Sequence, residues 1–218
     1  MIFLECIMFN SALTVIMQIP LQTPVFKAEL MSKMYHPVTY FYGRFISNYL
    51  FDVTAPLLMF FTAFYALGAN TEPQNVLQCV GVTMLMGILG NAVGYVCALL
   101  FDDHVNARNF LVMILILWIC NMGVLVNIDT NAFTRFAQYL SPPRFASEIM
   151  LKSLTNGKHI SIVYEGQVIY DLQVGEVFAS SLKYNFGISN CFSALGCWSL
   201  FYVLSATCVI WFRNWKFI

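Results

Sequence analysis

The order of apolar and polar residues along this 218-residue chain divides it into five long apolar segments with polar connections between them. Each apolar segment approaches the roughly 20 residues that an α-helix needs to cross the hydrocarbon core of a bilayer. A backbone in lipid has to satisfy its own hydrogen bonds, so helices are expected, and no series of alternating ten-residue strands is present. The predicted spans are 1–19, 45–67, 76–100, 110–128 and 192–212.

The connections predict how the chain is oriented. Residues 20–44 carry Lys27, Lys33 and Arg44, whereas the next connection carries neither lysine nor arginine. Short cytoplasmic loops are enriched in these two residue types, so 20–44 is assigned to the cytoplasm and 129–190 to the outer side. A long outer segment translocates largely regardless of the basic residues that it contains.

The outer segment 129–190 has an organisation of its own. Apolar residues at helical spacing surround a Ser-Pro-Pro break, which predicts two short helices that lie at the membrane interface or dip into it. The stretch ISIVYEGQVIYDL predicts a β-hairpin that turns at Glu165 and Gly166.

Composition supports a membrane protein. The chain is 59% hydrophobic and 10% charged, whereas a soluble domain carries roughly 25% charged residues. The formal net charge is zero, and nothing in the chain indicates a nucleic-acid partner. The chain opens inside an apolar segment without the basic n-region of a signal peptide. This start indicates a fragment, or a gene prediction that begins too late.

Candidate chemistry is sparse. No G-x-x-x-x-G-K-[ST] loop is present, so the chain is not expected to bind ATP in the P-loop manner. The three histidines are dispersed, and the seven cysteines form no C-x-x-C pair, so we predict no catalytic or metal site. Glu5 and Asp52 fall within spans, where an ionisable residue is a functional hypothesis by default. A structural role in the protein interior is favoured for Asp52, and Glu5 is expected to meet water.

Small and polar residues in the third and fourth spans predict helix packing. Gly90 and Gly94 form a G-x-x-x-G pattern that lets two helix backbones approach closely. Packing within the chain is favoured over dimerisation, with Asn91 forming a hydrogen bond across the same contact. For Asn121 and Asn127, hydrogen bonds between helices and the lining of a pathway both remain open.

Three stretches carry a resemblance to a known family: PVFKAELMSKMYHPVTYFYGRF, GVLVNIDTNAFTRFAQYLSPPRFASEIMLKSL, and GEVFASSL followed by a terminal span and a basic tail. Their order, spacing and hydropathy resemble the C-terminal part of the membrane domain of ATP-binding-cassette transporters of the G subfamily, both white-like and pleiotropic-drug-resistance-like. The resemblance covers essentially the whole chain. It implies an all-α membrane protein with about five transmembrane helices, a cytoplasmic coupling helix and short re-entrant or interfacial outer helices.

The resemblance assigns roles to particular residues. In this family the charged segment 20–44 is a coupling helix that packs on the nucleotide-binding domain. This chain has Lys-Ala-Glu where the family tends to Arg-Glu, so the two-pronged hydrogen bonding of an arginine is lost. The residues that match the coupling motif are Phe26, Lys27, Glu29, Met34 and Tyr35.

Two further groups of residues match positions on the family's transport pathway. An apolar valve between the central cavity and the outer exit falls on Val124 and Leu125, where the family usually has two leucines. The residues near positions that line the family's central cavity are Asn10, Val112, Met113 and Ile116.

The function implied by the resemblance is the transmembrane part of an ATP-driven exporter that moves lipids, sterols or hydrophobic drug-like molecules by alternating access. The family's first span and its nucleotide-binding domain, which holds ATP and magnesium and supplies the ATPase activity, are expected to be missing here. The resemblance also implies a second transmembrane half, in a homodimer or a heterodimer, and a location in the plasma membrane. Two alternatives stay open: a permease subunit with a separately encoded ATPase, and a non-transporting scaffold or degenerate transporter fragment.

Overall fold

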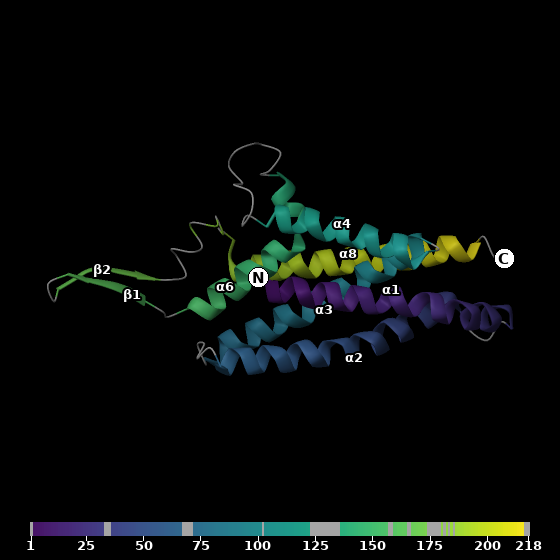
Figure 1. The fold of residues 1–218 in the computed structure, drawn as a ribbon, viewed down its shortest axis with the longest axis horizontal. Coiled ribbons are helices and arrows are strands. Elements are labelled where there is room, and N and C mark those ends of the chain that lie inside the picture. The colour runs from purple at the N-terminus through teal and green to yellow at the C-terminus, as the bar shows by residue number, and fades with distance from the viewer. Residues whose placement is uncertain are drawn as a thin grey trace. The chain divides into compact units, whose positions relative to one another are not determined.

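The computed structural model describes residues 2–32, 36–66, 72–101, 103–122, 136–156, 159–164, 167–173, 180, 182, 184 and 186–215. Most of these residues are helical, which confirms the predicted all-α membrane protein (Figure 1). The helices are α1 (Ile2–Met31), α2 (Pro37–Ala66), α3 (Pro73–Leu100), α4 (His104–Cys120), the 3-10 helix η1 (Gln138–Leu140), α6 (Pro142–Thr155) and α8 (Ile188–Trp215).

Within the described residues, three helical segments are long and apolar enough to cross a membrane: Val38–Thr62, Pro73–Leu100 and Ile188–Phe212. Two shorter apolar helical stretches, Phe3–Ile19 and His104–Cys120, lie in α1 and α4. Large apolar side chains such as Phe51 remain exposed along these helices, as expected of surfaces that face lipid. The depth and orientation of each segment in a bilayer stay predictions.

Local sequence explains where the helices begin. Helices α2 and α3 begin at Pro37 and Pro73. Proline has no backbone N–H, and the first position of a helix has no hydrogen-bond partner for that group in any case. The Asp103 carboxylate accepts a hydrogen bond from the Val105 N–H at 3.2 Å and caps the start of α4. The Ser-Pro-Pro break behaves as predicted: Ser141 is extended and precedes α6, with prolines in its first turn.

Helix α1 extends further than the sequence suggested. The predicted span ends at residue 19, but the helix continues through Pro24 to Met31. The first part of the predicted coupling segment is therefore a direct extension of the first apolar helix. The two prolines in this stretch each remove one backbone donor without ending the helix.

The chain forms two compact units. Unit 1 comprises Met1–Pro56, Met84–Ile116 and Gly196–Ile218, and unit 2 comprises Leu57–Thr83 and Leu117–Leu195. The core of unit 1 is an aromatic and aliphatic cluster from α1, α2, α3 and α8. Its buried members are Val15, Phe41, Phe45, Ala92, Tyr95, Ala206 and Ile210.

Unit 2 contains α6 and the predicted hairpin. Residues 142–149 of α6 are all buried, including an arginine and a glutamate. The hairpin is confirmed: β1 (His159–Tyr164) pairs antiparallel with β2 (Gln167–Gln173), from His159 opposite Gln173 to Tyr164 opposite Gln167. The predicted turn residues lie outside the described residues.

Candidate functional site

The predicted coupling residues fall at the end of α1. Glu29 lies in the last turns of this helix and is half-buried. The backbones of Phe26 and Lys27 belong to the same helix, whereas Met34 and Tyr35 lie outside the described residues. What these residues contact in a partner stays a prediction.

A polar contact joins α1 to α2 close to this segment. The Arg44 Nε donates a hydrogen bond to the Gln22 side-chain oxygen at 2.9 Å. Arg44 was counted in the sequence only as a basic loop residue, but it lies within α2. Because the bond to an arginine is charge-assisted, it is stronger than a hydrogen bond between neutral groups.

Aromatic packing continues the connection between α2 and α3. The ring of Phe41 meets that of Tyr95 edge to face, with 5.0 Å between centroids. The Tyr95 hydroxyl accepts a hydrogen bond from the buried Asn48 side chain at 3.1 Å. Offset and edge-to-face ring pairs favour a defined geometry. The segment of α2 that follows the coupling residues is thus held firmly against α3.

Gly90 and Gly94 allow α3 to approach α1 at backbone distance. A Cβ at Gly94 would stand 2.7 Å from the Ala12 carbonyl oxygen, and one at Gly90 would stand 2.9 Å from the Met8 Cα. Neither backbone neighbour can give way as a flexible side chain would, so glycine is required at both places. Asn91 does not bond across this contact as expected; its amide donates to the Phe45 carbonyl of α2 at 3.4 Å.

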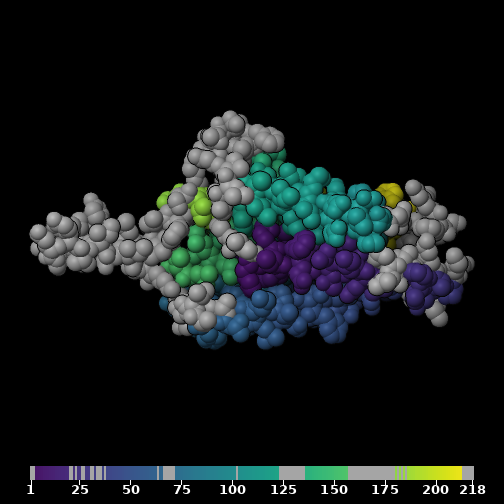
Figure 2. Space-filling model, in the orientation of Figure 1, coloured from purple at the N-terminus to yellow at the C-terminus, as the bar shows by residue number. Residues whose placement is uncertain are grey.

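The residues predicted to line a cavity all lie in unit 1 and are exposed in this single chain. Asn10 lies on α1, and Val112, Met113 and Ile116 lie on α4, with 38%, 51% and 55% exposure for the three apolar side chains. Figure 2 shows α4 at the surface of the molecule. The predicted valve residues Val124 and Leu125 lie outside the described residues.

The two acids within apolar helices differ from expectation in one respect. Both carboxylate oxygens of Glu5 are buried without a hydrogen-bond partner in the described part of the chain, so the expectation that Glu5 meets water is wrong for this conformation. One carboxylate oxygen of Asp52 is buried in the same way. Among the described residues, no three His, Cys, Asp or Glu side chains are grouped as a metal ion would require.

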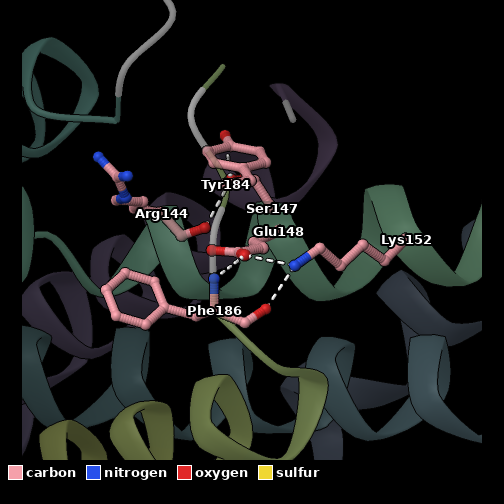
Figure 3. A network of polar contacts seen from close by, with 6 residues as sticks. All are labelled: Arg144, Ser147, Glu148, Lys152, Tyr184 and Phe186. Atoms are coloured by element: carbon pink, nitrogen blue, oxygen red, sulfur yellow. Dashed lines mark hydrogen bonds and ion pairs between the residues drawn. The ribbon is translucent and has the colours of Figure 1, made fainter. Parts of the chain in front are cut away.

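A buried polar network on α6 was missed in the sequence. Glu148 is fully buried, and its Oε1 accepts hydrogen bonds from Lys152 Nζ at 2.6 Å and from the Phe186 N–H at 2.7 Å (Figure 3). Lys152 also donates to the Phe186 carbonyl. One acid and one lysine therefore hold both backbone groups of Phe186, just before α8 begins.

The network continues through Tyr184. Its hydroxyl lies 2.7 Å from the Ser147 Oγ and 3.5 Å from the Met122 carbonyl oxygen, and the Arg144 guanidinium lies 5.7 Å from the centre of its ring. Burial raises the pKa of Tyr184 to about 12 and lowers the pKa of Arg144. Cation–π attraction of this kind is stronger where water is excluded. Ser141 adds a hydrogen bond to the Trp118 carbonyl at 2.9 Å.

A signal for this network does exist in the sequence. Arg144, Glu148 and Lys152 stand four residues apart, so on a helix they share one face. By charge alone, Arg144 and Lys152 are ordinary basic residues of the outer segment 129–190. Tyr184 and Phe186 carry no comparable signal, because only the fold brings them to α6.

Comparison with known proteins places the chain among membrane transporters. Residues 1–155 match the family described as ABC-2 type transporter. The chain is also similar to Protein white of Drosophila melanogaster, with 23% identity over 151 residues, which cover 69% of this chain. The matched region corresponds to 22% of the length of that protein.

Proposed function

Because this chain belongs to the ABC-2 type transporter family, we propose that it forms most of one transmembrane half of an ATP-driven exporter of the G subfamily. Its substrates are lipids, sterols or hydrophobic drug-like molecules, which suit a pathway bordered by side chains such as Val112, Met113 and Ile116. The similarity to Protein white and the three G-subfamily-like stretches support the assignment.

The observation that carries the mechanism is the continuity of α1. The helix runs unbroken from Ile2 to Met31, so the segment with Glu29 and the apolar stretch Phe3–Ile19 are parts of one element. A push on the coupling end is therefore transmitted along the helix. The Arg44–Gln22 hydrogen bond and the Phe41–Tyr95 contact pass the same displacement to α2 and α3.

Transport follows from two conformations of this arrangement. Substrate enters a cavity between two membrane halves, and ATP-driven closure of the nucleotide-binding domains narrows the cavity and moves substrate past Val124 and Leu125. A ligand shifts such an equilibrium only by its difference in affinity for the two states. Near-complete switching requires about 5.5 kcal/mol of differential binding. This energy comes from ATP and magnesium at the partner domain.

The proposal includes the partners and the location. A nucleotide-binding domain docks on the segment around Glu29, and a second transmembrane half, identical or related, completes the cavity. The assembly lies in the plasma membrane. The exposed cavity-side residues Asn10 and Met113 are the ones that the second half and the substrate would meet.

The test supplies the partner as a separate polypeptide. We would co-express the chain with the nucleotide-binding domain of a G-subfamily transporter, and measure co-purification and ATP-dependent movement of a fluorescent phospholipid in proteoliposomes. Glu29→Gln should weaken domain binding roughly tenfold, the effect of losing a charge-assisted hydrogen bond of about 1.5 kcal/mol.

Glu72→Gln is the matched control, since Glu72 is an exposed acid just before α3, on the side predicted to face outward. It should bind the domain as the unaltered chain does. Domain binding that is equally unaffected by both substitutions would contradict docking through Glu29. A chain that neither binds the domain nor moves lipid would favour the scaffold alternative.

A further inference from the structure

Side chains from the end of α6 are bonded to the beginning of α3 within unit 2. Ser153 Oγ donates a hydrogen bond to the Gln78 side-chain oxygen at 2.7 Å. The amide of Asn156, the C-cap of α6, donates to the Asn75 side-chain oxygen at 3.3 Å. Ser153 and Asn75 are buried, so water competes little for these bonds. Both acceptors lie in the first two turns of α3.

The same helix is bonded to the beginning of α8 through Phe186. Glu148 Oε1 accepts hydrogen bonds from Lys152 Nζ at 2.6 Å and from the Phe186 N–H at 2.7 Å, and Lys152 also donates to the Phe186 carbonyl (Figure 3). The rings of Tyr139 and Phe145 lie 5.7 and 5.8 Å from that of Phe186. Helix α8 starts two residues after Phe186. Its start is therefore fixed to α6 by both backbone groups of one residue.

One turn of α6 thus links the starts of two candidate spans. Lys152 and Ser153 are neighbours in the chain, and neighbouring side chains on a helix point in different directions, here towards α8 and α3. The two spans also meet directly, where an added Cβ at Gly81 would lie 3.4 Å from the Phe192 ring. Apolar contact gives helices little attraction in lipid, whereas hydrogen bonds require a defined distance and direction. The bonds of α6 should therefore set the spacing.

We propose that Lys152 is a positioning residue, and that with Glu148, Ser153 and Asn156 it makes α6 a brace. This brace keeps the starts of α3 and α8 at one spacing in both states of the transport cycle. The inference rests on the proposed function, which supplies the two states. It deepens that function, because these two helix ends then move as one body and the substrate path has to open by movement of other segments.

Pulsed EPR on the full chain in lipid nanodiscs measures the spacing, with spin labels at the exposed Leu77 of α3 and Ser193 of α8. The unaltered brace should give one narrow distance distribution. Lys152→Met removes the donor to the Phe186 carbonyl and to Glu148. It should lower the ratio of molecules at the original distance to all others about tenfold, as expected for one charge-assisted hydrogen bond. The cysteines that are not buried are first replaced by alanine: Cys6, Cys120, Cys197 and Cys208.

A second variant releases the other end of the brace. Ser153→Ala combined with Asn156→Ala removes both bonds to α3 and leaves no charge unpaired, so it tests the proposal even if Lys152→Met does not fold. The distance distribution should broaden in this variant as well.

Two controls separate the brace from general stability. Thr155→Val removes a neighbouring hydroxyl of α6 that donates to the Leu151 carbonyl of the same helix at 2.7 Å. Tyr95→Phe removes a hydrogen bond from the buried Asn48 in unit 1. Neither control should change the distance between the labels on α3 and α8.

The transport cycle is tested with the nucleotide-binding domain present. Addition of ATP and vanadate should leave the Leu77–Ser193 distance unchanged. A thiol cross-linker matched to the measured distance is then used to join Leu77→Cys to Ser193→Cys. Cross-linking should leave lipid transport at its original rate, and it should restore the transport that Lys152→Met has lost. A merely stabilising lysine would not be replaced by a link between two other helices.

Four outcomes would overturn the brace: an unchanged distance in both brace variants, an equal change in either control, a change on addition of ATP and vanadate, or loss of transport on cross-linking. If the unaltered chain binds the domain but moves no lipid, the proposed function is wrong. The brace is then judged on the distances in the variants alone.

Discussion

The contact between α1 and α3 in unit 1 and the network around α6 in unit 2 hold helices by opposite means. At Gly90 and Gly94 the side chains are absent, and two backbones meet directly. At α6, long charged side chains reach out from the helix, and Glu148 and Lys152 bind the backbone of a distant segment. The first contact depends on shape, and the second depends on hydrogen bonds between polar groups of distant segments.

The difference shows where each region is vulnerable. In an apolar environment, helices gain little from burying apolar surface against each other, so close packing of small residues supplies the attraction. A buried charge is stable only while its partners remain in place. Unit 1 should therefore respond most to added volume, and unit 2 should respond most to the loss of a polar partner.

The largest expected effect is that of Gly90→Ala. The new Cβ would stand within 2.9 Å of the Met8 backbone, so α1 has to move, at a cost of about 3 kcal/mol. The matched control is Gly43→Ala in α2, where an added Cβ would meet nothing within 4 Å beyond its own stretch of helix backbone. This control should stabilise the helix by roughly 0.5–1 kcal/mol. Unfolding titrations in mixed micelles measure both changes, and equal effects of the two substitutions would refute the close approach.

The second-largest loss of stability is expected for Glu148→Ala, which acts on unit 2. The substitution removes the carboxylate oxygen that accepts from Lys152 and from the Phe186 N–H. Breaking a buried pair costs about 3 kcal/mol. The loss of stability should be smaller here, because the Lys152 side chain is 24% exposed. Glu148→Gln keeps an acceptor oxygen for both donors and should lose less than half as much. If the alanine variant were as stable as the glutamine variant in the same titration, unit 2 would not depend on its polar partners as proposed.

The smallest effect is expected for Tyr95→Phe in unit 1. The substitution removes the acceptor of the Asn48 amide but keeps the ring against Phe41, so it should cost about 1 kcal/mol. Tyr42→Phe, which removes a partly exposed hydroxyl 3.4 Å from Thr207, is the control and should be close to neutral. A loss for Tyr95→Phe as large as that for Gly90→Ala would mean that unit 1 also depends on its polar bonds.

Several features of the molecule follow from short-range sequence patterns. The Ser-Pro-Pro break before α6 and the two strands of the hairpin are set by residues next to one another in the chain. The G-x-x-x-G pattern indicated a close contact for α3, but it did not identify Met8 and Ala12 as the neighbours. Coupling, cavity and valve residues were assigned from a resemblance, and their roles stay predictions.

The errors arise where distant segments meet. Glu5 was expected to reach water, yet both its carboxylate oxygens are buried. Asn91 was expected to bond across the glycine contact, but it faces Phe45 of α2 instead. The direction in which a polar side chain points depends on which helices surround it, and no local pattern contains that information.

The sequence by itself determined that this is a helical membrane protein, because apolar length and the scarcity of charge leave few other ways to satisfy a backbone in lipid. It also determined which stretches are similar to G-subfamily transporters. Only the tertiary structure decided that Arg144 and Glu148 are buried, and that Tyr184 stands between Ser147 and Met122. A buried charge is acceptable only with its partners in place, and one partner of Glu148, the Phe186 N–H, lies 38 residues away in the chain.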